Sequence, residues 1–366
     1  MNIGVITTSY PRGAGDAAGS FVAGHVDALR RLGHRVDVIA ADSIAEGASA
    51  REPGVTRIAS SLFYGGGAPD ELERHPLRSL PAAASFFARL TAEVARRSSR
   101  WHSTIAHWLA PSALAALSAR TPLLAIAHGG DVHTLRRMRL LEPALIALRA
   151  RGAQLAFVSS ELKQVAQRAV PRMARWLDDA LVQPMGLDLA RFTSIAAAPT
   201  TPPTVLIAAR LVALKGVDVA IDAVDHLRDR ARLVIAGDGP ERAVLEARAR
   251  GRASFLGAVD ADHRDRLLSD ASVVVVPSRV NHAGRTEGMP MIALEALAAG
   301  VPVVASAVGG LLELSPAVRL VPPDDPHSLA SAIERVLAAP PARHELRSAV
   351  QHLDWSMVAP RLVRTR

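Results

Sequence analysis

The feature that most constrains this chain is an alternation between short apolar runs of β-type residues and longer segments with helical periodicity. In the first half, the runs that predict strands lie at 2–9, 35–41, 103–108, 121–127 and 154–160. Segments such as "GSFVAGHVDALRRLG" (19–33) predict helices between them. Because the runs are apolar on both faces and helices separate them, the pattern predicts a parallel sheet in an α/β fold.

The alternation breaks at a Pro/Thr-rich stretch, "AAAPTTPPTVLIAAR" (196–210), and then starts again. The second set of predicted strands lies at 204–209, 232–237, 253–257, 272–278 and 301–306. We therefore predict two Rossmann-like, doubly wound units that face each other across a cleft, where both sets of strands end. The predicted boundaries are 1–188, 189–350 and, for a last helix that crosses back to the first unit, 351–366.

Composition is that of a globular protein and excludes several kinds of site. Hydrophobic residues make up 49% of the 366 residues and charged residues 21%, which is enough for a sizeable core. The absence of cysteine excludes disulfides and cysteine-based metal or redox sites. The start, "MNIGVITTSY", has no basic and then apolar leader, so we expect no secretory signal. Gly300 and Pro302 break the long uncharged run that ends at Glu313, so we interpret that run as core.

Two carboxylates, Glu287 and Glu295, lie in the apolar stretch "RTEGMPMIALEALAAGVPVVAS" (285–306). A bare carboxylate is costly in such surroundings. Pro290 suits the first turn of a helix and Gly300 its end, so we predict a helix between them. Glu287 then lies in the loop before the helix, and Glu295 lies about 7.5 Å further along the helix axis.

The amides of Gly288 and Met289 lie at the positive end of this predicted helix, which is a ready anion site. One ligand could therefore reach Glu287 at one end and Glu295 at the other, with a phosphate between them. A nucleotide sugar has this layout, because sugar and ribose hydroxyls flank its pyrophosphate. The alternative is a loop carboxylate near a helix start and a second carboxylate on a solvated face.

Two cations, Arg210 and Lys215, follow the first predicted strand of the second unit, where α/β sheets bind ligands. Lysine is scarce, since Lys163 is the only other one. A planar guanidinium and a compact ammonium together can neutralise a diphosphate. An ordinary solvated pair is the alternative.

Two glycine-bearing turns follow strands, at "PRGAGDAAGSF" (11–21) and "AGDGPER" (236–242). Gly19 would open a helix and let the backbone approach a phosphate closely. Gly237 would shape the second turn. A plain tight turn explains either segment as well.

A further polar group, "HGGDVH" (128–133), ends a predicted strand. His128 would lie at the edge of the cleft with Asp131 nearby, and His107 ends the preceding strand. A histidine at a strand end can equally be structural.

These segments resemble the retaining GT-B glycosyltransferases of family 4, the group 1 glycosyl transferases. "EGMPMIALEALAAGVPVVASAVGG" is similar to their E-x7-E signature. The segments before it also occur in family order: "AHGGDVH", "PMGLDLARF", "AARLVALKGVDVAIDAV", "AGDGPER" and "FLGAVD". Met289 stands where the family has Phe. The loop after Gly310 departs from the family's Gly-Gly-Ile-Pro-Glu, and Glu313 could serve there.

The resemblance implies transfer of a sugar from a nucleoside-diphosphate sugar to a glycan, lipid-linked or small-molecule acceptor, with retention of anomeric configuration. The first unit would bind the acceptor and the second the donor. Arg210 and Lys215 would neutralise the leaving diphosphate, Glu287 would orient the sugar hydroxyls, and His128 would contact the sugar. The remaining expected residues are Gly19, Gly237, Gly288, Met289, Pro290 and Glu295 for the donor, and His107 and Asp131 near the sugar or acceptor.

We expect neither a metal nor a cofactor. No Asp-x-Asp motif stands where a divalent ion would be needed, and the Asp pairs at 178–179 and 324–325 lack His or Glu partners at ligand spacing.

The net charge of +8 raises the question of an anionic partner. Nucleic acid is not expected, because aromatic residues make up only 4%. Segment 73–102 combines Arg74, Arg78, Arg89, Arg96, Arg97 and Arg100 with Leu77, Leu80, Phe86 and Phe87. It could lie on anionic lipid or be a core helix with a solvated arginine face. We expect a cytoplasmic protein, with peripheral contact at the inner membrane face as one alternative.

Three other functions are compatible with an α/β fold of this kind or need to be excluded. A nucleotide-sugar epimerase or a non-catalytic nucleotide-sugar-binding protein could share the architecture. An NAD-dependent enzyme is disfavoured, because G-x-G-x-x-G does not follow the first strand.

Overall fold

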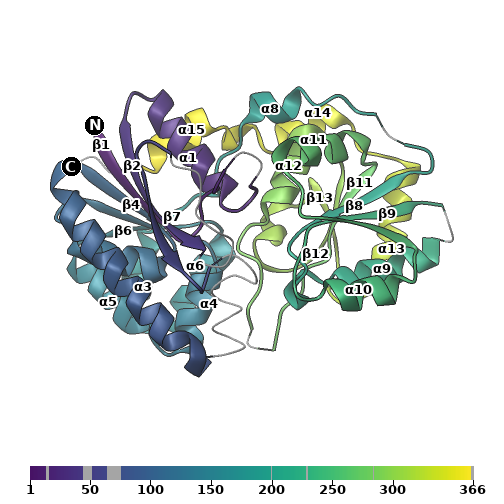
Figure 1. The fold of residues 1–366 in the computed structure, drawn as a ribbon. Coiled ribbons are helices and arrows are strands. Elements are labelled where there is room, and N and C mark those ends of the chain that lie inside the picture. The colour runs from purple at the N-terminus through teal and green to yellow at the C-terminus, as the bar shows by residue number, and fades with distance from the viewer. Residues whose placement is uncertain are drawn as a thin grey trace. The chain divides into compact units, whose positions relative to one another are not determined.

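The structure is a computed structural model that describes residues 1–13, 16–43, 52–63, 76–198, 200–227, 230–282 and 284–363. The chain divides into two compact units (Figure 1). The first contains residues 1–13, residues 18–186 and the C-terminal segment from Trp355, and the second contains Leu187–Asp354.

The first unit is built on a parallel sheet with strand order β3-β2-β1-β4-β5-β6-β7 in the described residues. The strand order reverses between β1 and β4, which makes this the switch point at which such sheets bind ligands. The strands are β1 (Asn2–Thr7), β2 (Arg35–Ser43), β3 (Val55–Ser60), β4 (Ser103–His107), β5 (Leu123–Ala127), β6 (Gln154–Phe157) and β7 (Leu181–Val182). The helices are α1 (Ser20–Arg31), α3 (Pro76–Arg97), α4 (Gly130–Arg137), α5 (Leu141–Ala150), α6 (Ser160–Ala169), α7 (Ala174–Asp178) and α15 (Trp355–Arg361).

The second unit repeats this plan with strand order β10-β9-β8-β11-β12-β13, again parallel throughout the described residues. Its switch point lies between β8 and β11. The strands are β8 (Thr204–Ala208), β9 (Arg232–Ala236), β10 (Ala253–Gly257), β11 (Val273–Val276), β12 (Val303–Ser306) and β13 (Val318–Val321). The helices are α8 (Leu189–Thr193), α9 (Val217–Leu227), α10 (Arg242–Ala249), α11 (Ala261–Asp270), α12 (Met291–Ala299), α13 (Pro326–Ala338) and α14 (Arg343–Ser348).

Helices cover both faces of the second sheet, as Figure 1 shows for α9, α10 and α13 on one side and α8, α11, α12 and α14 on the other. Two buried apolar clusters correspond to these faces. Successive valines of β11 point alternately into the two clusters, which is why the strand is apolar at every position.

Every strand predicted from the sequence overlaps an observed one, and the missed strands β3, β7 and β13 all lie at sheet edges. An edge strand is only partly covered, so it tolerates charged residues such as Arg57 and Arg319 and lacks a continuous apolar run. The predicted last helix is α15, which the structure groups with the first unit.

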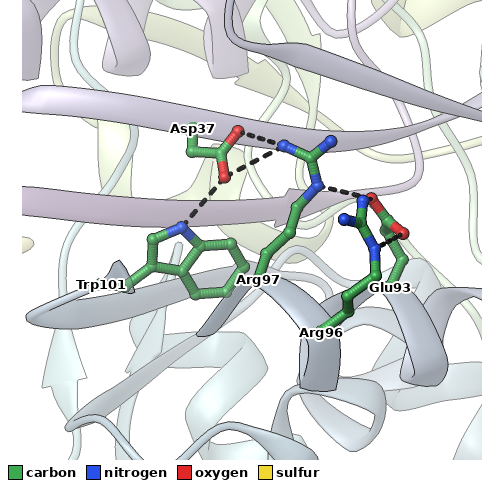
Figure 2. A network of polar contacts seen from close by, with 5 residues as sticks. All are labelled: Asp37, Glu93, Arg96, Arg97 and Trp101. Carbon is green, nitrogen blue, oxygen red and sulfur yellow. Dashed lines mark hydrogen bonds and ion pairs between the residues drawn. The ribbon is translucent and has the colours of Figure 1, made fainter. Parts of the chain in front are cut away.

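A polar network fastens the C-terminal end of α3 to the first sheet (Figure 2). Arg97 Nη1 lies 3.1 and 3.4 Å from the two carboxylate oxygens of Asp37, and Trp101 Nε1 donates to Asp37 at 3.1 Å. Arg96 and Arg97 both donate to Glu93, which they hold between them. The positive charge of both arginines is therefore balanced inside the unit.

Trp355 joins the C-terminal helix α15 to the first unit through a narrow slot. A Cβ atom on Gly24 would lie 2.7 Å from the indole nitrogen, and one on Gly186 would lie 2.5 Å from the ring. The ring of His25 stacks on the indole with centroids 5.2 Å apart and planes at 4°. Only glycine fits at the two flanking positions, because any side chain there would displace the indole.

Candidate active site

Lys215 and Glu287 form an ion pair at the switch point of the second sheet. Lys215 ends a short turn that follows β8, and Glu287 lies in the segment between β11 and α12. The Lys215 Nζ atom is 2.6 Å from Glu287 Oε1, and both side chains are largely buried. The structure thus brings together a cation and a carboxylate that the sequence separates by more than seventy residues.

Ser278, which follows β11, completes this pair. Its hydroxyl donates a hydrogen bond of 2.9 Å to the same Glu287 oxygen. Burial alone would raise the pKa of Glu287, but Lys215 and Ser278 outweigh it, so the pKa lies below its ordinary value. Glu287 is therefore ionised at neutral pH.

The backbone around the pair is tightly constrained. The Arg279 amide donates to the Leu214 carbonyl at 3.0 Å, which ties the loop after β11 to the loop that carries Lys215. Gly216 has φ 60°, and a Cβ atom there would lie 2.0 Å from the Pro277 carbonyl oxygen. Gly309 packs closely against the backbone of Glu287, since a Cβ atom there would lie 2.2 Å from the Glu287 carbonyl oxygen. These contacts fix the backbone that carries the side chains of Lys215 and Glu287.

Helix α12 begins at Met291, slightly later than expected. Pro290 is its N-cap residue with ψ 116°, so it is not yet helical, and its carbonyl accepts from the Ala293 amide at 3.2 Å. The first free amides of the helix therefore belong to Met291 and Ile292 rather than to Gly288 and Met289. The C-terminal end agrees with the prediction, with Gly300 left-handed at φ 76°.

Glu295 has a different set of partners from Glu287. Its Oε1 atom is 3.0 Å from Arg264 Nη1 on α11, and it lies 6% exposed within the helical layer. The Arg264 guanidinium also lies over the ring of Phe192 on α8, 5.5 Å from its centroid. The structure thus gives the second acid of the E-x7-E pattern a helix-packing role, and its expected contact with ribose stays a prediction.

Glu295 carries a testable pH dependence. Burial raises its pKa, and the Arg264 guanidinium only partly offsets this. A raised acid pKa means that its stabilising effect is present below the ordinary pKa of about 4.3 and is lost as pH rises through the folded value. We expect Glu295→Gln to gain stability relative to the wild type as pH rises from about 4.3 to 8. Urea unfolding at a series of pH values measures this, and a gap that shrinks with rising pH would contradict the assignment.

Arg210 and Gly237 follow β8 and β9. Arg210 is exposed directly beyond the end of β8. Gly237 has φ 139°, and a Cβ atom there would lie 1.8 Å from the Ala209 carbonyl oxygen. Gly237 is thus required by the close approach of two backbone segments, whatever else it contacts.

Gly19 has a comparable position in the first unit. It is the N-cap residue of α1 with φ 69°, and a Cβ atom there would lie 2.3 Å from the Ser9 carbonyl oxygen. The position therefore needs glycine to let the loop after β1 fold back on itself.

His107 and His128, both expected from the sequence, contact each other beside the switch point of the first sheet. His107 Nδ1 is 3.0 Å from His128 Nε2, and His107 Nε2 is 3.2 Å from Nδ1 of His25 on α1. His25 was not expected, because a histidine in an amphipathic helix gives no signal of a partner 82 residues away. We call these three residues the imidazole line.

Asp131 holds the backbone around His128. Its carboxylate accepts from the amides of Leu109, His128 and Gly129 at 2.7, 3.2 and 2.9 Å. Its described hydrogen bonds are thus to main-chain groups, and they fix the start of α4. Burial raises the pKa of Asp131 above its ordinary value, and the hydrogen bonds from these amides only partly offset this effect.

The described ranges contain neither a metal-binding cluster nor a membrane-spanning helix. No group of three or more His, Cys, Asp or Glu residues in them is arranged to hold a metal ion. No helix in the same ranges is long and apolar enough to span a bilayer.

Comparison with known proteins bears on both fold and site. Residues 202–339, which include Lys215, Ser278 and Glu287, match the family model described as "Glycosyl transferases group 1". An uncharacterized glycosyltransferase of Methanocaldococcus jannaschii is 40% identical over 144 residues, which are 37% of this chain and 35% of that protein. The aligned part is thus little more than a third of that relative's length.

Two matches extend over almost the whole chain. The D-inositol 3-phosphate glycosyltransferase of Xylanimonas cellulosilytica is 29% identical over 400 aligned positions, covering 95% of this chain and 91% of that protein. The crystal structure of Anabaena HepE in complex with UDP-glucose superposes with a TM-score of 0.71 at 17% identity, covering 99% of this chain and 98% of that one. At this identity the likeness shows the fold alone.

The fold is therefore the GT-B fold predicted from the sequence, with two parallel, helix-covered sheets. The matching family model and the relatives from Methanocaldococcus jannaschii and Xylanimonas cellulosilytica are all described as glycosyl transferases or glycosyltransferases.

Proposed function

We propose that the protein transfers a glycosyl group from a nucleoside-diphosphate sugar to an acceptor, with retention of anomeric configuration. The observation that carries the proposal is the Lys215–Glu287 pair, held by Ser278 at the switch point of the unit that matches the group 1 family. The UDP-glucose complex of HepE supports a nucleotide-sugar donor.

Glycosyl transfer requires positive groups beside the leaving diphosphate and a negative group beside the sugar. Breaking the anomeric C–O bond develops negative charge on the leaving diphosphate and positive charge on the sugar. Lys215, Arg210 and the first amides of α12 would stabilise the diphosphate. Glu287, ionised and half of an ion pair, would accept hydrogen bonds from the sugar hydroxyls.

Retention follows in this proposal from a front-face route. The leaving phosphate would take the proton of the acceptor hydroxyl as the new glycosidic bond forms on the same face. Glu287 is engaged by both Lys215 and Ser278, which favours a binding role over attack on the anomeric carbon.

Metal independence is part of the proposal. Lys215 and Arg210 supply the positive charge that a divalent ion supplies elsewhere. Addition of EDTA should therefore leave turnover unchanged, and loss of activity that Mg²⁺ or Mn²⁺ restores would contradict this part.

The first unit would bind the acceptor, with His128 nearest the transferred sugar. His128 lies beside the switch point of its sheet and is partly accessible, whereas His107 behind it is buried. A glycan, a lipid-linked sugar or a small molecule are the acceptor classes to be tested.

A thermal-shift screen against UDP-, GDP- and ADP-sugars, beginning with UDP-glucose, tests the donor. The sugars that stabilise the protein are then offered with acceptors, and NMR of the product gives the anomeric configuration. Interconversion of the donor sugar without transfer would instead establish an epimerase. Binding with neither transfer nor hydrolysis would establish a non-catalytic binding protein.

Peripheral contact with anionic lipid at the inner membrane face is proposed for the N-terminal part of α3. Leu80 and Phe87 are 47% and 38% exposed there, and Arg78 is exposed beside them. Arg96 and Arg97 do not contribute, because Glu93 and Asp37 balance their charge (Figure 2). Arg74 lies outside the described residues.

Sedimentation with anionic vesicles at low salt tests this contact. We expect salt-sensitive pelleting that Leu80→Glu with Phe87→Glu abolishes and that Arg96→Gln leaves unchanged. Equal sedimentation with neutral vesicles, or none at low salt, would contradict it and leave α3 as a core helix with a solvated face.

A further inference from the structure

The imidazole line crosses the first unit from its C-terminal helix to the partly accessible His128. Trp355 of α15 stacks on His25, His25 contacts His107, and His107 contacts His128. His25 and His107 are completely buried. The outer end is enclosed by Phe21 and Trp108, whose ring centroids lie 5.1 and 4.8 Å from that of His128.

All three rings are neutral at pH 7. Burial lowers the pKa of His25 and of His128 to about 3, and it lowers the pKa of His107 well below its ordinary value. Each ring therefore carries one proton, and each of the two nitrogen–nitrogen contacts must hold one proton between its atoms.

Only two arrangements of protons satisfy both contacts. In the first, protons lie on Nδ1 of His25, His107 and His128, so each ring donates toward the outer end. In the second, protons lie on all three Nε2 atoms, so each ring donates toward the inner end. The two arrangements leave His128 Nδ1 as a donor or as an acceptor, respectively.

The inner end decides between them. His25 Nε2 is buried and has no hydrogen-bond partner among the described residues. In the first arrangement this atom is a bare acceptor, and in the second it is an orphaned N–H donor. Orphaned buried N–H groups are the rarer of the two in folded proteins, which favours the first arrangement.

We propose that His25 and His107 are positioning residues that fix His128 as the Nδ1–H tautomer, so that its outer nitrogen is a hydrogen-bond donor. Where the proposed function holds, this nitrogen donates to an oxygen of the transferred sugar or of the acceptor. It does not serve as a base, because a ring nitrogen that carries hydrogen has no in-plane lone pair with which to accept a proton.

Nitrogen NMR of the histidine side chains in the intact, ligand-free protein tests the proposal. Protonated and bare ring nitrogens have well-separated ¹⁵N chemical shifts. The signals that disappear in His128→Gln are those of His128. We expect protonated Nδ1 and bare Nε2 in His128, His107 and His25. Protonated Nε2 in His128 would overturn the proposal, and the result does not depend on any glycosyl transfer.

An isosteric pair at the centre of the line tests His107 directly. The amide of His107→Asn can donate to His128 Nε2, whereas the carboxylate of His107→Asp can only accept from it. The comparison is made at about pH 9, above the usual pKa of the new aspartate and of His128. There we expect the Asn variant to keep the Nδ1–H tautomer of His128, and the Asp variant to have the Nε2–H tautomer. The same His128 tautomer in both variants would show a purely structural role and overturn the proposal.

The pair also has a catalytic readout. We expect a donor-sugar KM or turnover that is about 3–10-fold worse in His107→Asp than in His107→Asn, the worth of one neutral hydrogen bond. A wild-type protein without transfer activity would refute the proposed function while leaving the tautomer measurement valid.

Discussion

Replacement of Lys215 by alanine is expected to lower kcat/KM by about 10²–10³-fold, the usual worth of one preorganised group that stabilises developing charge. Its ammonium lies 2.6 Å from Glu287 Oε1 and is the compact cation nearest the proposed sugar-binding acid. Steady-state kinetics with the donor found by thermal shift measures the effect. Lys215→Arg should recover part of the loss, because it restores the charge but not the shape.

The other lysine of the chain is a matched control. Lys163 Nζ donates to the carbonyl oxygens of Asp178 and Ala180 at 2.7 and 3.0 Å, and all three residues belong to the first unit, whereas the ion pair belongs to the second. Lys163→Ala should therefore keep wild-type turnover. Wild-type turnover in Lys215→Ala would remove that residue from the mechanism.

The second large effect is expected for Glu287→Gln, which should lower turnover by about 10²-fold or more while the fold is retained. The amide keeps the shape and can still accept from Ser278, but it loses the charge that holds Lys215. Glu334→Gln, on the exposed face of α13, is the control and should be neutral. Circular dichroism and thermal unfolding verify that each variant is folded.

The two replacements combined give a further test of the pair. In a double-mutant cycle for unfolding at pH 7, Lys215→Ala and Glu287→Gln should be coupled by about 1–3 kcal/mol. Because the folded pKa of Glu287 lies below its ordinary value, the contribution is present above about pH 4.3 and is lost as pH falls through the folded value. Additive effects at neutral pH would mean that the pair contributes nothing to stability.

The sequence alone was sufficient to predict most strands of both sheets and the C-terminal end of α12. Strands buried on both faces, such as β8 and β11, have unbroken apolar runs, and Gly300 marks the end of α12 because a left-handed residue is needed there. The position of Lys215 after the first strand of the second unit, and that of Glu287 in the loop before α12, were predicted from the local pattern.

Side-chain partners across the fold could not be predicted in the same way. The ion pair of Glu295 with Arg264 depends on how α11 and α12 pack, which their sequences do not specify. The contact of His25 with His107 depends on the position of α1 beside β4, and neither residue gives a local signal of it. Ser278 could have been suspected, since it is the first hydroxyl after the buried strand at the switch point.

Calorimetric titration is the most direct test of the claim that Lys215 binds the diphosphate and Glu287 the sugar of one nucleotide sugar. A nucleoside diphosphate and the matching nucleoside-diphosphate sugar are each titrated into the wild type, Lys215→Ala and Glu287→Gln. We predict that Lys215→Ala weakens binding of both ligands, whereas Glu287→Gln weakens only that of the sugar nucleotide. Wild-type affinity of both variants for both ligands would contradict the account.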